Sequence, residues 1–162
     1  MKYWVCKAAP GLIYEAMECL GGNGYVEEGI LARHFRESPV NAIWEGSGNV
    51  MCLDVLRALS REAEAASAVL QDLVEETTGL PGAADAAASI GKAFHRPDSE
   101  RVARLAVEKL ALLAAAAALN KVSPRHAELF AATRLAGNHA SMYGAVDLAG
   151  DDIRGLLERA LP

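Results

Sequence analysis

The sequence predicts an all-α protein, an up-and-down bundle of about six or seven helices. Alanine, leucine, glutamate and arginine, which favour helices, dominate the chain, whereas β-branched residues are comparatively sparse. Apolar residues recur at the three- and four-residue spacing of a helix face, and the two-residue alternation of a half-buried strand is hard to find. Since 52% of the 162 residues are hydrophobic, the chain is long and apolar enough to bury a core.

Glycine and proline separate the helices expected in the first half of the chain. Residues 2–20 should form the first helix, with a kink or a restart at Pro10 and an end at the glycines of 21–24. We expect a short helix over 27–35, then an extended stretch over 40–44. The next helix should begin at Ser47 or Asn49, because either side chain is a good N-cap, and should continue to about residue 74 with a break near Ser60.

The second half is expected to hold three further helices and one ambiguous segment. The alanine-rich residues 83–94 favour no single state. Asp98 or Ser99 should cap a long helix to about residue 120, and Ser123 followed by Pro124 should begin another to about residue 136. After a looser stretch, an amphipathic helix is expected over 151–161.

Charge and cysteine content narrow the classes of function. The formal net charge of −5 argues against a chain that mainly neutralises phosphates. Cys6, Cys19 and Cys52 form no CxxC pair and lie in apolar helical segments, which predicts buried, reduced thiols and a cytoplasmic protein. The four histidines make no metal-ligand pattern, and no apolar run reaches the roughly 20 residues needed to span a bilayer. We therefore expect no metal and no membrane partner.

Two segments exceed what a plain helical bundle needs. In Gly21-Gly22-Asn23-Gly24-Tyr25, three glycines allow the backbone to approach a ligand closely, although a helix C-cap followed by a turn also explains them. In Ile43-Trp44-Glu45-Gly46-Ser47-Gly48-Asn49, a carboxylate stands just before a helix. Burial beside an apolar acyl chain would make Glu45 a stronger base, but the spacing fits a solvated residue near a cap equally well.

In this order and separation, the two segments, together with Arg36-Glu37, resemble the acyl-CoA dehydrogenase family in its C-terminal helical domain. In that family a GGxGY turn follows a long helix and an I-(Y/W)-E-G-(T/S) segment opens the next one. The longer run over residues 36–57 looks most like the branch of adaptive-response flavoproteins of alkylation damage. The detailed likeness covers 2–59. It implies a domain core over 1–60, and we expect 61–162 to be an extended helical region packing on the same bundle.

The resemblance implies roles for single residues. Glu45 matches the catalytic base that removes the α-proton of an acyl-CoA while the β-hydride passes to FAD. Gly46 matches a substrate contact, and Ser47 and Asn49 match flavin contacts. Gly21 and Gly22 match the turn near the adenosine diphosphate half of FAD. Where many members have glutamine before the glycine pair, this chain has Glu18, and a carboxylate there offers no donor and would repel a pyrophosphate.

The same resemblance implies an incomplete site. The family adds an N-terminal helical domain and a middle β-domain, and no β-rich stretch is present in this sequence. We therefore expect this chain to bind FAD weakly, to be inactive alone, and to act as part of a homo-oligomer.

Two other functions stay open. The alkylation-response likeness suggests DNA, with possible phosphate contacts at Arg96, Arg101, Arg104, Lys109, Lys121, Arg125 and Arg134. DNA binding is disfavoured, because twelve basic residues face fourteen acidic ones from Leu56 onward. The other possibility is a bundle that only mediates oligomerisation. Trp4, Trp44 and Phe130 would be core or interface residues, with core the default.

Overall fold

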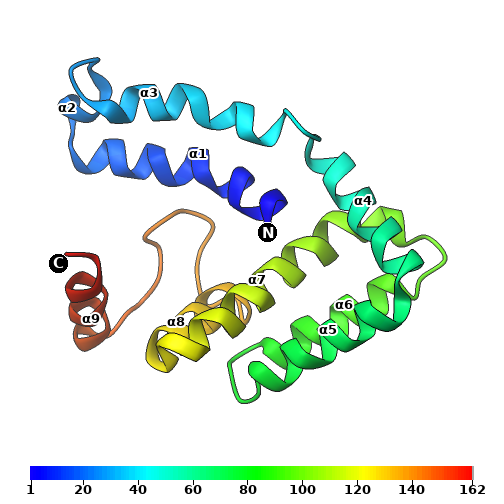
Figure 1. The fold of residues 1–162 in the computed structure, drawn as a ribbon. Helices are drawn as coiled ribbons and strands as arrows, with labels where there is room; N and C mark the ends of the chain where they lie inside the picture. The colour runs from blue at the N-terminus through cyan, green and yellow to red at the C-terminus, as the bar shows by residue number, and fades with distance from the viewer. Residues whose placement is uncertain (162) are drawn as a thin grey trace.

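The computed structural model describes residues 1–161 and is all-α, as predicted (Figure 1). Its elements in chain order are α1 (Lys2–Cys19), α2 (Gly22–Tyr25), α3 (Ile30–Glu37), the 3-10 helix η1 (Ser38–Ala42), α4 (Gly48–Arg61), α5 (Ala63–Glu76), α6 (Ala83–Phe94), the 3-10 helix η2 (Ser99–Val102), α7 (Ala103–Val122), α8 (Pro124–Arg134) and α9 (Gly150–Ala160). The helices are more numerous than expected because several of the predicted connections are themselves short helices.

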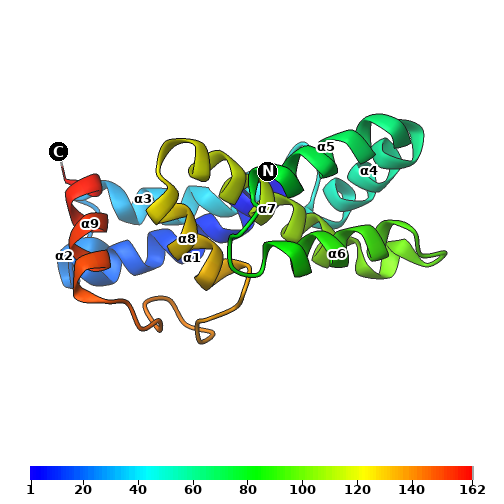
Figure 2. The ribbon, with the colours of Figure 1, turned by 90° about the horizontal axis from the view of Figure 1, so that it is seen from below.

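The helices form two packed groups that share α7. In Figure 1, α1 and α3 lie side by side with α2 at their joined end, and α4 leads away from them to α5 and α6. Helix α7 packs against α1, α4, α5, α6 and α8. A long loop then leads from α8 to α9 and runs along one edge of the molecule, as the orange trace in Figure 2 shows. Helix α7 therefore joins the two groups of helices.

Small side chains allow α7 to sit close to its neighbours. Its buried residues are mostly alanines, and Leu113 is 0% exposed. Leu113 packs with Ile90 of α6 in one cluster, and Val107 packs with Tyr3 of α1 and Cys52 of α4 in the other. Alanines on one face of a helix allow a neighbouring helix axis to come close. This short separation brings the larger side chains of the two clusters into dispersion contact.

Two local predictions were wrong, and a third is narrowed. Residues 40–44 are not extended, since η1 spans Ser38–Ala42 and turns follow it. The long helix does not begin at Asp98 or Ser99, because η2 precedes α7. Of the two alternatives at Pro10, a kink or a restart, the restart is wrong, because α1 continues through Pro10 to Cys19. The ambiguous segment 83–94 is the helix α6, and its alanines are buried against α7. Tertiary packing therefore determines the conformation of this segment, which its composition alone left open.

The predicted burial of cysteines and aromatic residues holds only in part. Cys52 is buried, Cys6 is partly buried, and Cys19 is exposed near the end of α1. Trp4 meets Phe130 of α8 edge to face with ring centroids 6.4 Å apart, whereas Trp44 is 59% exposed. Within residues 1–161, no helix combines the length and the apolar character that crossing a bilayer requires.

Candidate functional site

The segment between η1 and α4 forms a turn with an unusual backbone. Glu45 has φ +55° and Gly46 has φ +113°. Among the residues that the structure describes, Glu45 is the one non-glycine residue with positive φ. Such a conformation costs a β-carbon-bearing residue on the order of 1–3 kcal/mol and is typical of functional sites. The turn therefore holds the Glu45 carboxylate in a position that ordinary helix entry would not produce.

Lys2 braces this turn from the start of α1. Its Nζ donates a hydrogen bond of 2.9 Å to the Trp44 carbonyl oxygen and lies 3.6 Å from Glu45 Oε2. The Glu45 side chain is 79% exposed, so its carboxylate faces open space on the other side. One ammonium group thus contacts both the backbone and the carboxylate of the turn.

Ser47 and Gly48 seat the beginning of α4. Ser47 occupies the N-cap position as predicted and its carbonyl accepts from Met51 N–H at 2.9 Å, but its side chain makes no capping hydrogen bond. Gly48 is buried, and a β-carbon there would lie 3.0 Å from Lys7 Cε and 3.4 Å from the Tyr3 ring. Gly48 therefore allows α4 to approach α1 closely, a packing reason that the sequence reading missed.

Tyr3, Arg104 and Cys52 hold α1, α4 and α7 together beneath this turn. Arg104 Nε donates to the Tyr3 hydroxyl at 3.0 Å, and the phenol oxygen raises the pKa of the Arg104 guanidinium. Burial raises the pKa of the Cys52 thiol. Because the Glu45 turn directly precedes α4, these contacts of α1, α4 and α7 determine its position. Sequence spacing could not find this contact, because Tyr3 and Arg104 are 101 residues apart.

The glycine turn lies at the other end of α1. Gly21 has φ +57°, and β-carbons added at Gly21 or Gly22 would meet no atom within 4 Å. Gly24 is buried instead, and a β-carbon there would lie 2.2 Å from the Met17 carbonyl oxygen. Of the three glycines, two therefore leave backbone open to a ligand and one is required by packing.

A cavity of about 600 Å³ lies beside the glycine turn and is lined by Met17, Tyr25, Val26, Glu27, Glu28, Ala32, Phe35 and Arg36. Arg36 binds Glu27 through both guanidinium nitrogens, one at 2.8 Å, and this contact lowers the pKa of the Glu27 carboxyl. Arg36, singled out in the sequence as part of the motif, therefore fixes the loop after α2.

The two predicted segments do not meet within one chain. The glycine turn follows the C-terminal end of α1, and the Glu45 turn lies beside Lys2 at its N-terminal end (Figure 1). An 18-residue helix is about 27 Å long, so the segments are separated by roughly that distance. Each can contribute only part of a larger site.

Most of the basic residues suggested for DNA contact already have partners. Arg96 and Arg101 bind Asp98, Lys121 lies 2.6 Å from Glu76, and Arg125 lies 2.8 Å from Asp152. Arg104 binds Tyr3, not Glu108, and Lys109 donates to Ser89. Six of the seven candidate residues therefore have a partner within the chain, and four of these six partners are carboxylates.

Comparison with known proteins finds a likeness in the part of the chain that carries the Glu45 and glycine turns. Residues 1–60 match the model of the acyl-CoA dehydrogenase C-terminal domain. The chain is 60% identical over 62 residues to "Putative acyl-CoA dehydrogenase AidB" of Escherichia coli (strain K12), covering 38% of this chain and 12% of that protein.

Two further relatives are more distant. Acyl-CoA dehydrogenase family member 11 of Caenorhabditis elegans is 43% identical over 60 residues, which is 37% of this chain and 10% of that protein. The mitochondrial short-chain specific acyl-CoA dehydrogenase of Bos taurus is 39% identical over 49 residues, 30% of this chain and 12% of that protein. The alignments with these curated relatives thus span only about a tenth of each relative's length.

Proposed function

From the match of residues 1–60 to the acyl-CoA dehydrogenase C-terminal domain, we propose that this chain supplies the catalytic base to α,β-dehydrogenation of an acyl-CoA. The observation that carries the proposal is the Glu45 turn: a carboxylate on a positive-φ backbone, exposed, and braced by Lys2. A general base must be fixed in position while its carboxylate stays accessible to the substrate, and this turn meets both requirements.

Glu45 would accept the α-proton of the thioester. The Cα–H bond breaks as a carboxylate oxygen takes the proton, and its electron pair becomes the new α,β double bond as the β-hydrogen departs with its own pair. FAD, when bound, would accept that hydride. Gly46, with φ +113°, carries no β-carbon, so a substrate can approach the backbone beside Glu45.

The polar groups around the turn fit a flavin. Within residues 1–161, the Ser47 hydroxyl and the Asn49 amide make no side-chain hydrogen bond, which leaves both groups to bind a ligand. Gly21 and Gly22 present unobstructed backbone for the adenosine diphosphate half. Because they lie at the far end of α1 from Glu45, we propose that the two segments serve different FAD molecules in a homo-oligomer.

The surface that carries these segments is apolar enough to require a partner. Tyr25 is 78% exposed, Ile43 66% and Trp44 59%. We propose that other parts of a larger acyl-CoA dehydrogenase assembly cover these side chains, with 61–161 supporting the 1–60 core through α7, and that the chain alone is inactive. Cys6 and Cys19 are free thiols, which suits the reducing cytoplasm.

A segment exchange tests the function. The 62-residue stretch of the Escherichia coli relative that aligns with this chain is replaced by the corresponding stretch of this chain, and anaerobic bleaching of bound flavin by acyl-CoAs of several chain lengths is followed. We expect the exchanged protein to retain flavin and to be bleached. Glu45→Gln should slow bleaching by about 100-fold or more without loss of flavin. Equal rates with Gln would contradict the role of Glu45 as base.

A further inference from the structure

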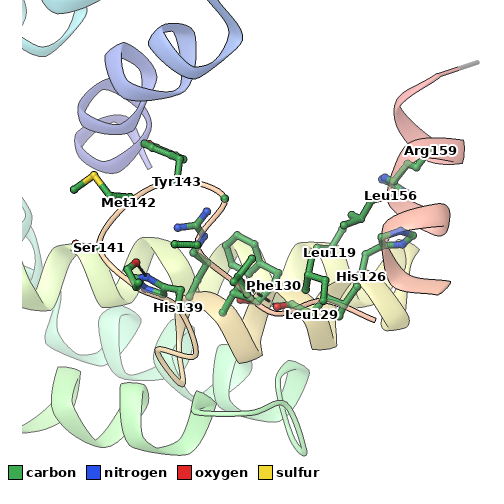
Figure 3. Close-up of a pocket in the computed structure, with 17 residues that line it drawn as sticks. Leu119, His126, Leu129, Phe130, His139, Ser141, Met142, Tyr143, Leu156 and Arg159 are labelled. Carbon is green, nitrogen blue, oxygen red and sulfur yellow. Dashed lines mark hydrogen bonds between the residues drawn. The ribbon is translucent and has the colours of Figure 1, made fainter. Parts of the chain in front are cut away.

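A cavity far along the chain from the Glu45 turn contains none of the residues discussed above as a flavin or substrate contact. It has a volume of about 510 Å³ and lies between the end of α7, α8, the loop before α9, and α9 itself (Figure 3). This volume falls within the usual range for small-molecule sites, which is roughly 300–1,000 Å³. Its size alone therefore admits a small organic ligand.

The walls of the cavity are largely apolar and come from separate elements. Leu119 lies in the last turns of α7, Leu129 and Phe130 lie on α8, Met142 lies on the loop, and Leu156 lies on α9 (Figure 3). These side chains form a surface that favours a hydrocarbon body over water. Exposed apolar surface at the junction of these four segments is unfavourable in water, so an apolar ligand would stabilise it.

The charge of the cavity is opposite to that of the protein. Arg134, Arg159, His126 and His139 line it, and no aspartate or glutamate does, although acidic residues outnumber basic ones in the chain. By contrast, the cavity beside the glycine turn carries Glu27 and Glu28. The electrostatic potential inside the α8–α9 cavity therefore favours an anion.

The guanidinium of Arg134 is available for such an anion. Most arginines of the chain bind a carboxylate or, for Arg104, a phenol. Within residues 1–161, Arg134 makes no ion pair and no side-chain hydrogen bond, and Arg159 makes none there either. A planar guanidinium binds a carboxylate through two parallel hydrogen bonds, so a carboxylate is the anion that this geometry favours.

The loop that closes the cavity is fixed at both its turn and its tip. Ala140 N–H donates to the Ala145 carbonyl at 2.9 Å, which closes the turn. The Tyr143 hydroxyl donates to the Ala8 carbonyl of α1 at 3.3 Å, and the Tyr143 ring occupies the space where a β-carbon of Gly11 would stand. The absence of a side chain at Gly11 thus lets α1 anchor the wall of the cavity.

We propose that the α8–α9 cavity binds a small organic carboxylate with an apolar body, whose carboxylate is held by Arg134 and whose hydrocarbon part contacts apolar lining residues such as Phe130, Met142 and Leu156. This site is independent of the proposed dehydrogenase role of Glu45. It uses a different region of the chain and needs no cofactor.

Three probes, each with a linear chain of eight carbons, test the proposal on the full chain: sodium octanoate, 1-octanol and octyltrimethylammonium. Methyl NMR titration should show saturable shifts of the Met142 and Leu156 signals with octanoate. Octanol should bind about tenfold more weakly, since it lacks the charge-assisted hydrogen bonds, and the ammonium more weakly still. Equal binding of all three, or shifts centred instead on Ile30 and Phe35 of α3, would overturn the proposal.

Arginine variants separate the anion contact from general apolar binding. Arg134→Gln should weaken octanoate about tenfold and leave octanol unchanged, and Arg134→Lys should fall between Gln and wild type. Arg61→Gln is the matched control, because Arg61 is exposed, makes no ion pair within residues 1–161 and does not line this cavity. An equal loss of octanoate binding in Arg61→Gln, or no loss in Arg134→Gln, would rule out the Arg134 contact.

Discussion

The α1–α4 segment and the α6–α8 segment differ in how they use apolar side chains. In α1–α4 many large ones are exposed, among them Leu12 at 61% and Ile30 at 65%. In α6–α8 the buried residues are mainly alanines, with Ile90 and Leu113 fully enclosed. The family match covers residues 1–60, which lie within the more exposed segment.

This difference suggests that α6–α8 mainly stabilise the fold, whereas α1–α4 carry the residues proposed to act on a substrate. Helices α6–α8 bury their apolar faces against one another, so the free energy of unfolding should depend most on them. The α1–α4 segment keeps its large side chains available for other surfaces and relies on α7 through Tyr3 and Arg104. Substitutions of large apolar side chains should therefore lower the free energy of unfolding strongly in α6–α8 and little in α1–α4.

The largest expected effect is on the core of the second segment. Leu113→Ala should lower the free energy of unfolding by about 2–5 kcal/mol, because it removes a fully buried side chain and leaves a cavity. Leu12→Ala should change it by less than about 0.5 kcal/mol. Urea unfolding followed by circular dichroism measures both. A comparable loss in the two variants would show that α1 is buried against a partner in solution.

A second pair of variants tests the glycine turn. Gly24→Ala should destabilise the protein by roughly 2 kcal/mol or more, since its β-carbon would lie 2.2 Å from the Met17 carbonyl oxygen. Gly22→Ala should be nearly neutral for stability, because a β-carbon there meets no atom within 4 Å. Thermal unfolding compares the two. If Gly22→Ala proved the more destabilising, the assignment of packing to Gly24 and open backbone to Gly22 would be wrong.

Thiol chemistry gives the third contrast. Burial raises the pKa of Cys52 and removes it from solvent, so iodoacetamide should modify exposed Cys19 well before Cys52. The buried neutral thiol contributes to stability at pH values below the ordinary thiol pKa. That contribution should decline as the pH rises through the higher pKa of the folded state. Mass spectrometry of the modified chain measures the two modification rates, and urea unfolding at several pH values, with Cys52→Ala as reference, measures the stability contribution. Equal modification rates would mean that α4 opens readily from α7.

Only a small effect on stability is expected at Lys2. Lys2→Met should cost less than about 1 kcal/mol, because the contact with Glu45 is exposed. It should nevertheless increase backbone motion at Trp44, Glu45 and Gly46, which amide ¹⁵N relaxation measures. Lys92→Met, on an exposed part of α6, is the control. Unchanged relaxation would show that the turn is rigid without its ammonium brace.

The fold class was predictable because helix-forming residues and glycine or proline breaks carry it locally. The failures were also local in origin. Residues 40–44 are apolar enough to suggest a strand, yet η1 packs against α1, and that tertiary contact decides the backbone. Cys19 fits the apolar spacing of α1, but it lies near the end of the helix, where α1 meets solvent.

For the candidate site, the sequence identified the motif residues but not the contacts that hold them in position. Glu45 and Gly46 could be selected from a short pattern, but the positive φ of Glu45 and the bond from Lys2 to the Trp44 carbonyl require three-dimensional placement. The proposed roles of Gly21, Gly22, Ser47 and Asn49 remain predictions. The α8–α9 cavity had no sequence signal, because its lining comes from short stretches of four elements.

The contact between Tyr3 and Arg104 has a consequence during synthesis. Helix α4 ends at Arg61, and α7, on which α1 and α4 pack, ends at Val122. At about 5–20 residues per second, the ribosome needs roughly 3–12 seconds to make the chain between these two points. During that interval the Glu45 turn exists without α7, the helix on which α1 and α4 pack. A chaperone that binds apolar side chains would find them exposed on α1–α4 in the nascent chain, and the completion of α7 would mark the time of its release.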